Sequence, residues 1–206
     1  MKKRRGSILI ALGVLLILGA LGLAGYNVLD ARRAAQDADL VQVRLEQQIE
    51  RNKTAKTAPL PGQQRLGDEM PVEEIDGRRY IGTIEIPALN KKLPVLEDWS
   101  YANLKISPCR YSGSYYTDDM VLCAHNYRTH FGQIGRLTKG NRLTFTDAEG
   151  NEYAYRVVKR ETVKPDETWK LVNGDYALTL FTCTLSGGRR TVIRCELISV
   201  NGTAVS

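Results

Sequence analysis

The sequence predicts an all-β domain with short helices, built as a closed barrel or a sandwich of seven or eight strands and preceded by an N-terminal transmembrane helix. Two observations support this prediction. An apolar run without charged residues occupies residues 6–29, and from Tyr80 onward short apolar segments alternate with turn residues. The 206 residues allow one cored domain of about 130 residues and a stalk, and they exclude a large multidomain enzyme.

The apolar run is long enough to cross a bilayer. At about 1.5 Å per residue, its helix approaches the roughly 30 Å of the hydrocarbon layer. A cleaved signal peptide is the alternative, because Ala20, Gly22 and Ala24 offer small residues for a cleavage site, but the apolar core of such a peptide is usually about 7 to 15 residues. The length therefore favours an uncleaved anchor. The basic leader at residues 1–5 predicts a cytoplasmic N-terminus, with the bulk of the chain outside.

Residues 30–79 are expected to form a juxtamembrane helix and a linker. Residues 30–52 are rich in helix formers and carry a thin apolar stripe made of Leu29, Ala35 or Gln36, Leu40, Val43 and Ile49. This stripe is too short and too interrupted for a coiled coil, which favours a spacer. Residues 53–79 contain several Pro and Gly residues and no sustained hydrophobic periodicity. This composition is typical of a linker that holds a folded domain away from the membrane.

The remaining residues, 80–206, show the alternation of β-strands. Turn signals separate the segments, for example at residues 147–151 and 173–175. The expected strands cover residues 80–86, 93–96, 121–124, 142–146, 152–159, 177–182 and 191–200.

The charge of the chain is a topology signal and not a nucleic-acid footprint. The net charge is +6, and Lys2, Lys3, Arg4 and Arg5 supply four of these charges. Residues 80–206 carry sixteen basic and thirteen acidic side chains, a net of +3. That density is too low for a DNA-binding domain, so we expect no nucleic-acid partner.

Few side chains can perform chemistry. The histidines are His125 and His130, and the cysteines are Cys109, Cys123, Cys183 and Cys195. Their spacings match no zinc template, so no metal is expected, and the even cysteine count in an exported domain suggests disulfides. Cys183 is the exception, because it ends a strand, precedes a glycine-rich turn and is followed by the arginines of the next strand. A nearby guanidinium favours the thiolate that attacks carbonyl groups.

These segments resemble the sortases, the family of surface transpeptidases of Gram-positive bacteria. Thr179-Leu180-Phe181-Thr182-Cys183 fits the Thr-Leu-x-Thr-Cys signature of the family, and Val121-Leu122-Cys123-Ala124-His125, followed by Phe131-Gly132, is similar to its histidine segment, with alanine in place of the usual glycine. Arg190 lies where sortases carry their arginine, although Arg189 and Arg194 are near. The resemblance implies a sortase-like closed β-barrel over residues 80–206, with Cys183, His125 and Arg190 as catalytic residues.

The resemblance also implies a function. The chain would be a single-pass protein of the cell membrane with an extracellular catalytic domain. It would cleave Leu-Pro-x-Thr-Gly-like sorting signals of secreted proteins through a thioacyl intermediate on Cys183, and transfer the acyl group to an amine of a cell-wall precursor or a pilin, without a cofactor. His130 is expected in a surface loop. Cys123 and Cys195 are expected to be packed thiols, and Cys109 could pair with either.

Three other interpretations were weighed. A papain-like peptidase usually places its cysteine before its histidine, whereas His125 precedes Cys183 here. An L,D-transpeptidase has the observed order and location, but its Ser-His-Gly-x-Cys signature is absent from the sequence. A non-enzymatic β-domain that binds a partner at the cell surface would explain the anchor and the strands, and it would leave the placement of the three site residues to chance.

Overall fold

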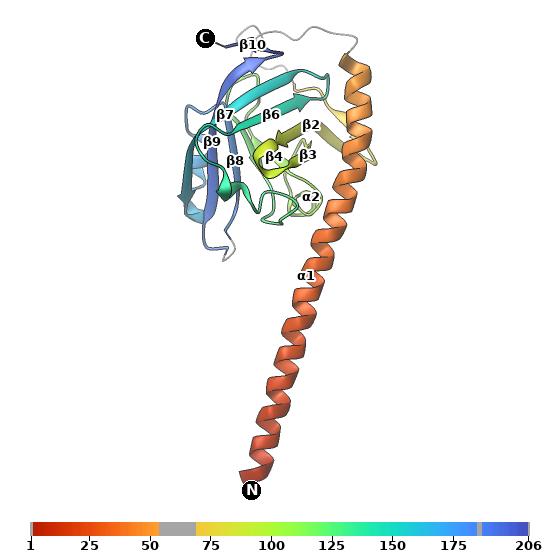
Figure 1. The fold of residues 1–206 in the computed structure, drawn as a ribbon, viewed down its shortest axis with the longest axis vertical. Coiled ribbons are helices and arrows are strands. Elements are labelled where there is room, and N and C mark those ends of the chain that lie inside the picture. Colours follow the sequence, from red (N-terminus) through yellow and green to blue (C-terminus); the bar gives the residue numbers. More distant parts are fainter. Residues whose placement is uncertain (1, 54–68, 185–186, 206) are drawn as a thin grey trace.

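The computed structural model describes residues 2–53, 69–184 and 187–205 and confirms the predicted fold class (Figure 1). A long N-terminal helix, α1 (Lys2–Lys53), stands beside a β-barrel that carries short helices. The strands are β1 (Glu73–Ile75), β2 (Arg78–Ile86), β3 (Lys91–Leu96), β4 (Cys109–Ser112), β5 (Met120–Cys123), β6 (Arg142–Asp147), β7 (Glu152–Val163), β8 (Leu178–Cys183), β9 (Arg190–Val200) and β10 (Thr203–Ala204). The short helices are α2 (Tyr101–Leu104), α3 (Trp169–Val172) and the 3-10 turns Pro87–Leu89, Ile134–Arg136 and Pro165–Glu167.

The barrel closes through eight strands in the order β2-β3-β4-β5-β8-β9-β7-β6, with β6 pairing back onto β2. The pairs β3–β4 and β5–β8 are parallel and the other pairs in this ring are antiparallel. Strand β2 lies between β3 and β6, and Gly82 permits the closure. A Cβ at Gly82 would lie 2.0 Å from the Thr146 carbonyl oxygen, and its φ of +148° suits glycine alone.

Two clusters of buried apolar side chains hold the fold together. The larger one includes Ile84, Leu122, Phe145, Leu180 and Ile193, all with no more than trace exposure. These positions come from five strands of the ring, and a barrel of this size is filled by its own side chains. The smaller cluster joins Leu45 of α1 to strand residues that include Tyr80, Leu96, Val121 and Phe181.

Helix α1 is continuous from the apolar segment into the part that contacts the barrel, and its buried face differs from the predicted stripe. Leu40 and Val43 of that stripe are exposed at 63% and 55%, whereas Ile49 of the same stripe is buried. The buried face consists of Ala38, Val41, Gln42, Leu45 and Ile49. The helix therefore carries two apolar stripes, and the one that contains Val41 and Leu45 packs into the second apolar cluster. The segment is therefore a docked helix and not a free spacer.

Polar contacts fix the position of α1 along the barrel. Arg44 is 2.9 Å from Asp76 in the β1–β2 turn, and Glu46 is 2.7 Å from Lys92 on β3. Each ion pair is largely exposed and contributes little to stability, so the pairs act mainly by setting the register of the helix. The C-terminal end of α1 is held as well. Asn52 donates to Glu73 and to the Ala148 carbonyl, at 2.8 and 2.9 Å.

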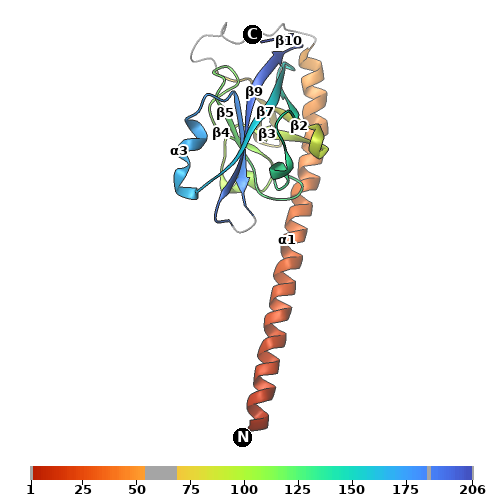
Figure 2. The ribbon, with the colours of Figure 1, turned by 60° about the vertical axis from the view of Figure 1, so that its left-hand side comes forward.

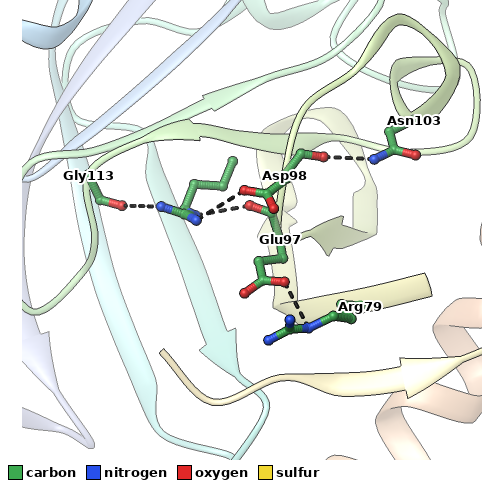
Figure 3. Close-up of polar contacts among 6 residues, drawn as sticks. Arg79, Glu97, Asp98, Asn103 and Gly113 are labelled. Atoms are coloured by element: carbon green, nitrogen blue, oxygen red, sulfur yellow. Dashed lines mark hydrogen bonds and ion pairs between the residues drawn. The ribbon is translucent and has the colours of Figure 1, made fainter. Parts of the chain in front are cut away.

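The β-structure begins earlier than predicted. Glu73 pairs with Tyr80, so residues 73–79, which the sequence assigned to the linker, are part of the sheet. The short strand β4 also escaped prediction. Its Arg110 donates to the Glu97 and Gly113 carbonyls and contacts Asp98, while Arg79 pairs with Glu97 at 2.9 Å (Figure 3). This network joins β4 to the ends of β2 and β3.

The structure places the cysteines and histidines partly as expected. All four cysteines are free thiols. The suggested disulfides are therefore absent. Cys109, Cys123 and Cys195 are buried, which agrees with the expectation of packed thiols at Cys123 and Cys195. Burial raises the pKa of both Cys123 and Cys195 to about 12, which makes them poor nucleophiles.

His130 lies in a turn, as expected for a loop histidine, but its side chain is fully buried and not at the surface. The segment that follows His125 turns back into the barrel, where Phe131 and Ile134 enter the main core and carry His130 inward. Burial, with smaller contributions from the nearby charges of His125 and Lys91, lowers the pKa of His130 to about 4.

This burial predicts a pH dependence of stability. As pH falls below about 6.5, His130 becomes protonated in the unfolded chain, whereas in the folded chain it stays neutral until about pH 4. We expect His130 to cost the wild type roughly 3 kcal/mol of unfolding free energy across this window. In the His130→Phe variant, the free energy of unfolding should fall less steeply than in the wild type across this window, because the contribution of His130 is absent. Urea unfolding at a series of pH values measures this difference. Parallel pH profiles for the two proteins would contradict the burial of a neutral histidine.

Candidate active site

Strand β8 ends at Cys183 and is hydrogen-bonded on both sides. On one side it runs parallel to β5, with Cys123 opposite Phe181. Continuing this register by two residues places His125 beside Cys183. On the other side β8 is antiparallel to β9, and Cys183 lies opposite Arg190. The three predicted site residues therefore lie at neighbouring strand ends, on one rim of the barrel.

Thr182 strengthens the β5–β8 junction next to the cysteine. Its hydroxyl is buried and donates to the Ala124 carbonyl at 2.8 Å, and the Ala124 amide donates to the Phe181 carbonyl at 3.3 Å. These two bonds hold the residues directly before Cys183 and His125 against each other. Because a buried hydroxyl without a partner is costly, the threonine also favours this single arrangement.

The two candidate arginines occupy different environments. The Arg190 guanidinium donates to the carbonyls of Gly187 and Arg189, both at 3.2 Å, and these contacts are exposed. Arg194 is 3% exposed. It donates to Glu161 at 2.8 Å, to Thr179 at 2.9 Å and to the carbonyls of Leu171 and Lys170. Arg194 thus has a structural role, while Arg190 stands beside Cys183 on the accessible rim.

Cys183 lines a pocket of about 380 Å³. The turn after His125 forms one wall of it, and the strands β8 and β9 form the other. Gly132 lets this turn close on itself, because a Cβ there would lie 2.2 Å from the Asn126 carbonyl oxygen. The Asn126 side chain reaches across and donates to the Thr184 carbonyl at 3.4 Å. The lining residues are Asn126, Gly132, Gly135, Thr182, Cys183, Thr184 and Thr191.

The ring of His125 belongs to an aromatic stack. Its centroid lies 4.8 Å from that of Tyr127, which in turn lies 5.4 Å from that of His130. The buried end of this stack is rigid, because His130 is enclosed by the core. The stack restricts where the His125 imidazole can swing.

Sequence reasoning identified the three rim residues but missed the ones that shape the pocket. Asn126, Gly135 and Thr191 carry no motif of their own, and only the fold brings them together. For Gly132 and Thr182 a signal existed, because both belong to the quoted motifs. Within residues 2–53, 69–184 and 187–205, no group of three or more His, Cys, Asp or Glu side chains is arranged to hold a metal ion.

Comparisons with known proteins agree on one family. Sortase D of Bacillus subtilis (strain 168) is 36% identical over 90 residues, which are 42% of this chain and 44% of that protein. The match thus spans less than half of that relative. Among solved structures, sortase C1 of Streptococcus agalactiae superposes with a TM-score of 0.54 at 26% identity, covering 76% of this chain and 89% of that one.

A more distant structure shows the same fold. Sortase A of Listeria monocytogenes gives a TM-score of 0.52 at 24% identity, covering 62% of this chain and 91% of that one. The family model of the sortase domain matches residues 84–198, more than half of the chain, and this range contains Cys183, His125 and Arg190. The chain belongs to the sortase family.

Proposed function

We propose that this chain is a membrane-anchored cysteine transpeptidase that cleaves Leu-Pro-x-Thr-Gly-like sorting signals of secreted proteins. The observation that supports this most directly is the position of Cys183 at the end of β8, between the strand end that leads to His125 and the first residue of β9, Arg190. The acyl acceptor is an amine of a cell-wall precursor or a pilin. Residues 80–206 form the catalytic head, and residues 30–79 connect it to the anchor.

The proposed reaction has two acyl transfers. The Cys183 thiolate attacks the carbonyl carbon before the scissile bond, and the tetrahedral intermediate collapses to a thioester while the C-terminal fragment leaves as an amine. The imidazolium of His125 supplies the proton that the leaving amine takes. Neutral His125 then accepts a proton from the incoming amine, whose nitrogen attacks the thioester and releases the Cys183 thiolate.

Arg190 is proposed to bind the substrate carbonyl that becomes an oxyanion. Its present partners are two exposed backbone carbonyls of the β8–β9 turn, so a substrate carbonyl could take their place without leaving a buried group unpaired. A cation placed where negative charge develops stabilises the transition state more than the ground state.

The anchor is proposed for the N-terminal part of α1. Leu12–Leu29 is an 18-residue helical window with a mean hydropathy of 2.0, and none of it is buried against the rest of the molecule. Its length is about 27 Å at 1.5 Å per residue. The basic residues before it favour a cytoplasmic N-terminus and an extracellular head.

The nucleophile is tested by two cysteine variants of the full chain in detergent. Cys183→Ala should abolish cleavage of a fluorogenic Leu-Pro-x-Thr-Gly peptide, because the sulfur atom that attacks the peptide carbonyl is lost. Cys195→Ala removes a buried thiol at the opposite end of the same strand pair, where Cys195 faces Leu178, and should retain nearly full turnover. Normal cleavage by the Cys183→Ala protein would disprove the assignment.

The arginine assignment is tested by comparing Arg190→Ala with Arg194→Ala. Loss of Arg190 should lower kcat/KM by about 10²- to 10³-fold with little change in stability. Loss of Arg194 leaves Thr179 and the carbonyls of Leu171 and Lys170 without their buried donor and leaves Glu161 only its pair with Lys159. This loss should cost about 3 kcal/mol of unfolding free energy. Kinetics at 20 °C and denaturant unfolding measure both effects. If Arg194→Ala remained stable but inactive while Arg190→Ala remained active, the catalytic role would belong to Arg194.

A further inference from the structure

Helix α1 joins the apolar segment to the barrel without a break. The backbone is helical from Lys2 to Lys53, including the eight residues 30–37 between the end of the apolar window at Leu29 and Ala38, which is buried against the barrel. The sequence of this helix contains no proline, the residue that most often kinks a long helix. A continuous helix transmits both rotation and translation from one end to the other.

The docked part of α1 is held against the barrel at both of its ends. Ala38 and Val41 are buried near the beginning of the contact, and Ile49 is buried near its end. Beyond Ile49, Lys53 is 2.9 Å from Glu152 at the start of β7. Together with the Arg44 and Glu46 ion pairs, these contacts hold the barrel in one orientation about the helix.

The barrel rim that carries Cys183 faces the apolar half of α1. Strand β9 begins at Arg190 on this rim and ends at Val200, where Val200 pairs with Tyr153, the neighbour of the Glu152 that binds Lys53. The far end of β9 thus lies near the C-terminal end of α1. Both views show β9 running from there toward the end of the barrel from which the N-terminal half of α1 emerges (Figures 1 and 2).

Element lengths place this rim close to the end of the apolar window. The ten residue steps from Arg190 to Val200 span about 33 Å, or roughly 25 Å along a barrel axis for strands tilted by about 40°. A helix covers 25 Å in about 17 residues. Counting back from Lys53, the Cys183 rim is level with the helix near residue 36, about 10 Å beyond Leu29.

We propose that residues 30–37 act as a fixed spacer that sets the height of the Cys183 pocket above the bilayer surface. This proposal rests on the proposed function, because it assumes that residues 6–29 span the membrane and that Cys183 is the nucleophile. The headgroup region adds about 5 to 8 Å to each side of the hydrocarbon layer, so the pocket opens at the outer surface of the headgroups. A donor peptide held at that surface by its own apolar segment meets the pocket only at this height, whereas a peptide free in solution has no such requirement.

Helix geometry allows height and rotation to be varied separately. Each inserted residue turns the barrel by about 100° and lifts it by about 1.5 Å. Two alanines inserted between Arg33 and Ala34 therefore rotate the rim by about 200° and lift it by only about 3 Å. Seven residues rich in alanine and glutamine turn it by about −20° and lift it by roughly 10 Å. Both insertions lie outside the buried face that begins at Ala38.

The experiment compares the full chain and the two insertion variants in phosphatidylglycerol–phosphatidylcholine vesicles. Each protein receives the same Leu-Pro-x-Thr-Gly peptide in two forms, one soluble and one joined through a short tail to a transmembrane helix in the same vesicles. We expect the seven-residue insertion to lower turnover of the anchored donor at least tenfold. The two-alanine insertion mainly turns the barrel about the membrane normal with little change of height, so it should stay within twofold of wild type. Both variants should cleave the soluble peptide within twofold of wild type. A third variant, with residues 30–37 replaced by an equally long Gly-Ser segment, should show an intermediate loss.

The outcomes separate this proposal from the proposed function. If the seven-residue variant processes the anchored donor at the wild-type rate, the fixed-spacer proposal is wrong, while cleavage of the soluble peptide still supports the enzyme. An equal loss of both activities would also overturn it, because the segment would then act on the head itself and not on its placement. If the wild type cleaves neither form, the proposed function fails.

Discussion

The whole site depends on the double pairing of β8. Its parallel bonds to β5 and its antiparallel bonds to β9 fix three neighbouring strand ends on one rim, and the buried bond from Thr182 to Ala124 holds the first two in register. A slip of one residue in either pairing would turn Cys183 to the other face of the sheet. The closure of the ring at Gly82 supports this register indirectly, because a closed barrel has no edge at which strands can shift.

Helix α1 packs mainly against β1, β2 and β3, whereas the site lies at the ends of β5, β8 and β9. One cluster of buried side chains nevertheless connects the two, because it contains Leu45 of α1 together with Phe181, which lies two residues before Cys183 on β8. The docked part of α1 is therefore packed as part of the barrel.

Much of this architecture could be predicted from the sequence because its signals are local. Alternation along residues 152–159 and 191–200 marks long strands, and the Thr-Leu-Phe-Thr-Cys segment marks a strand that ends in a cysteine. Strand β4 escaped because Cys109–Ser112 has only four residues with no clear alternation and owes its place to the Arg110 network. The apolar stripe of residues 30–52 coincides only in part with the buried face of α1. Leu40 and Val43 are as apolar as Val41 and Leu45, and only the barrel surface distinguishes the two stripes.

His130 shows the limit of such reasoning most clearly. It lies in the turn between Tyr127 and Gly132, yet its side chain is enclosed by the core, and nothing local in the sequence distinguishes such a turn from one at the surface.

The central claim is that Cys183 is the nucleophile. Intact-mass measurement of the protein after rapid acid quench with a Leu-Pro-x-Thr-Gly peptide tests it most directly. We predict an added mass equal to the acyl fragment, located on the peptide that contains Cys183 and removed by hydroxylamine. Cleavage of the peptide without that adduct, or an adduct on another residue, would contradict the account.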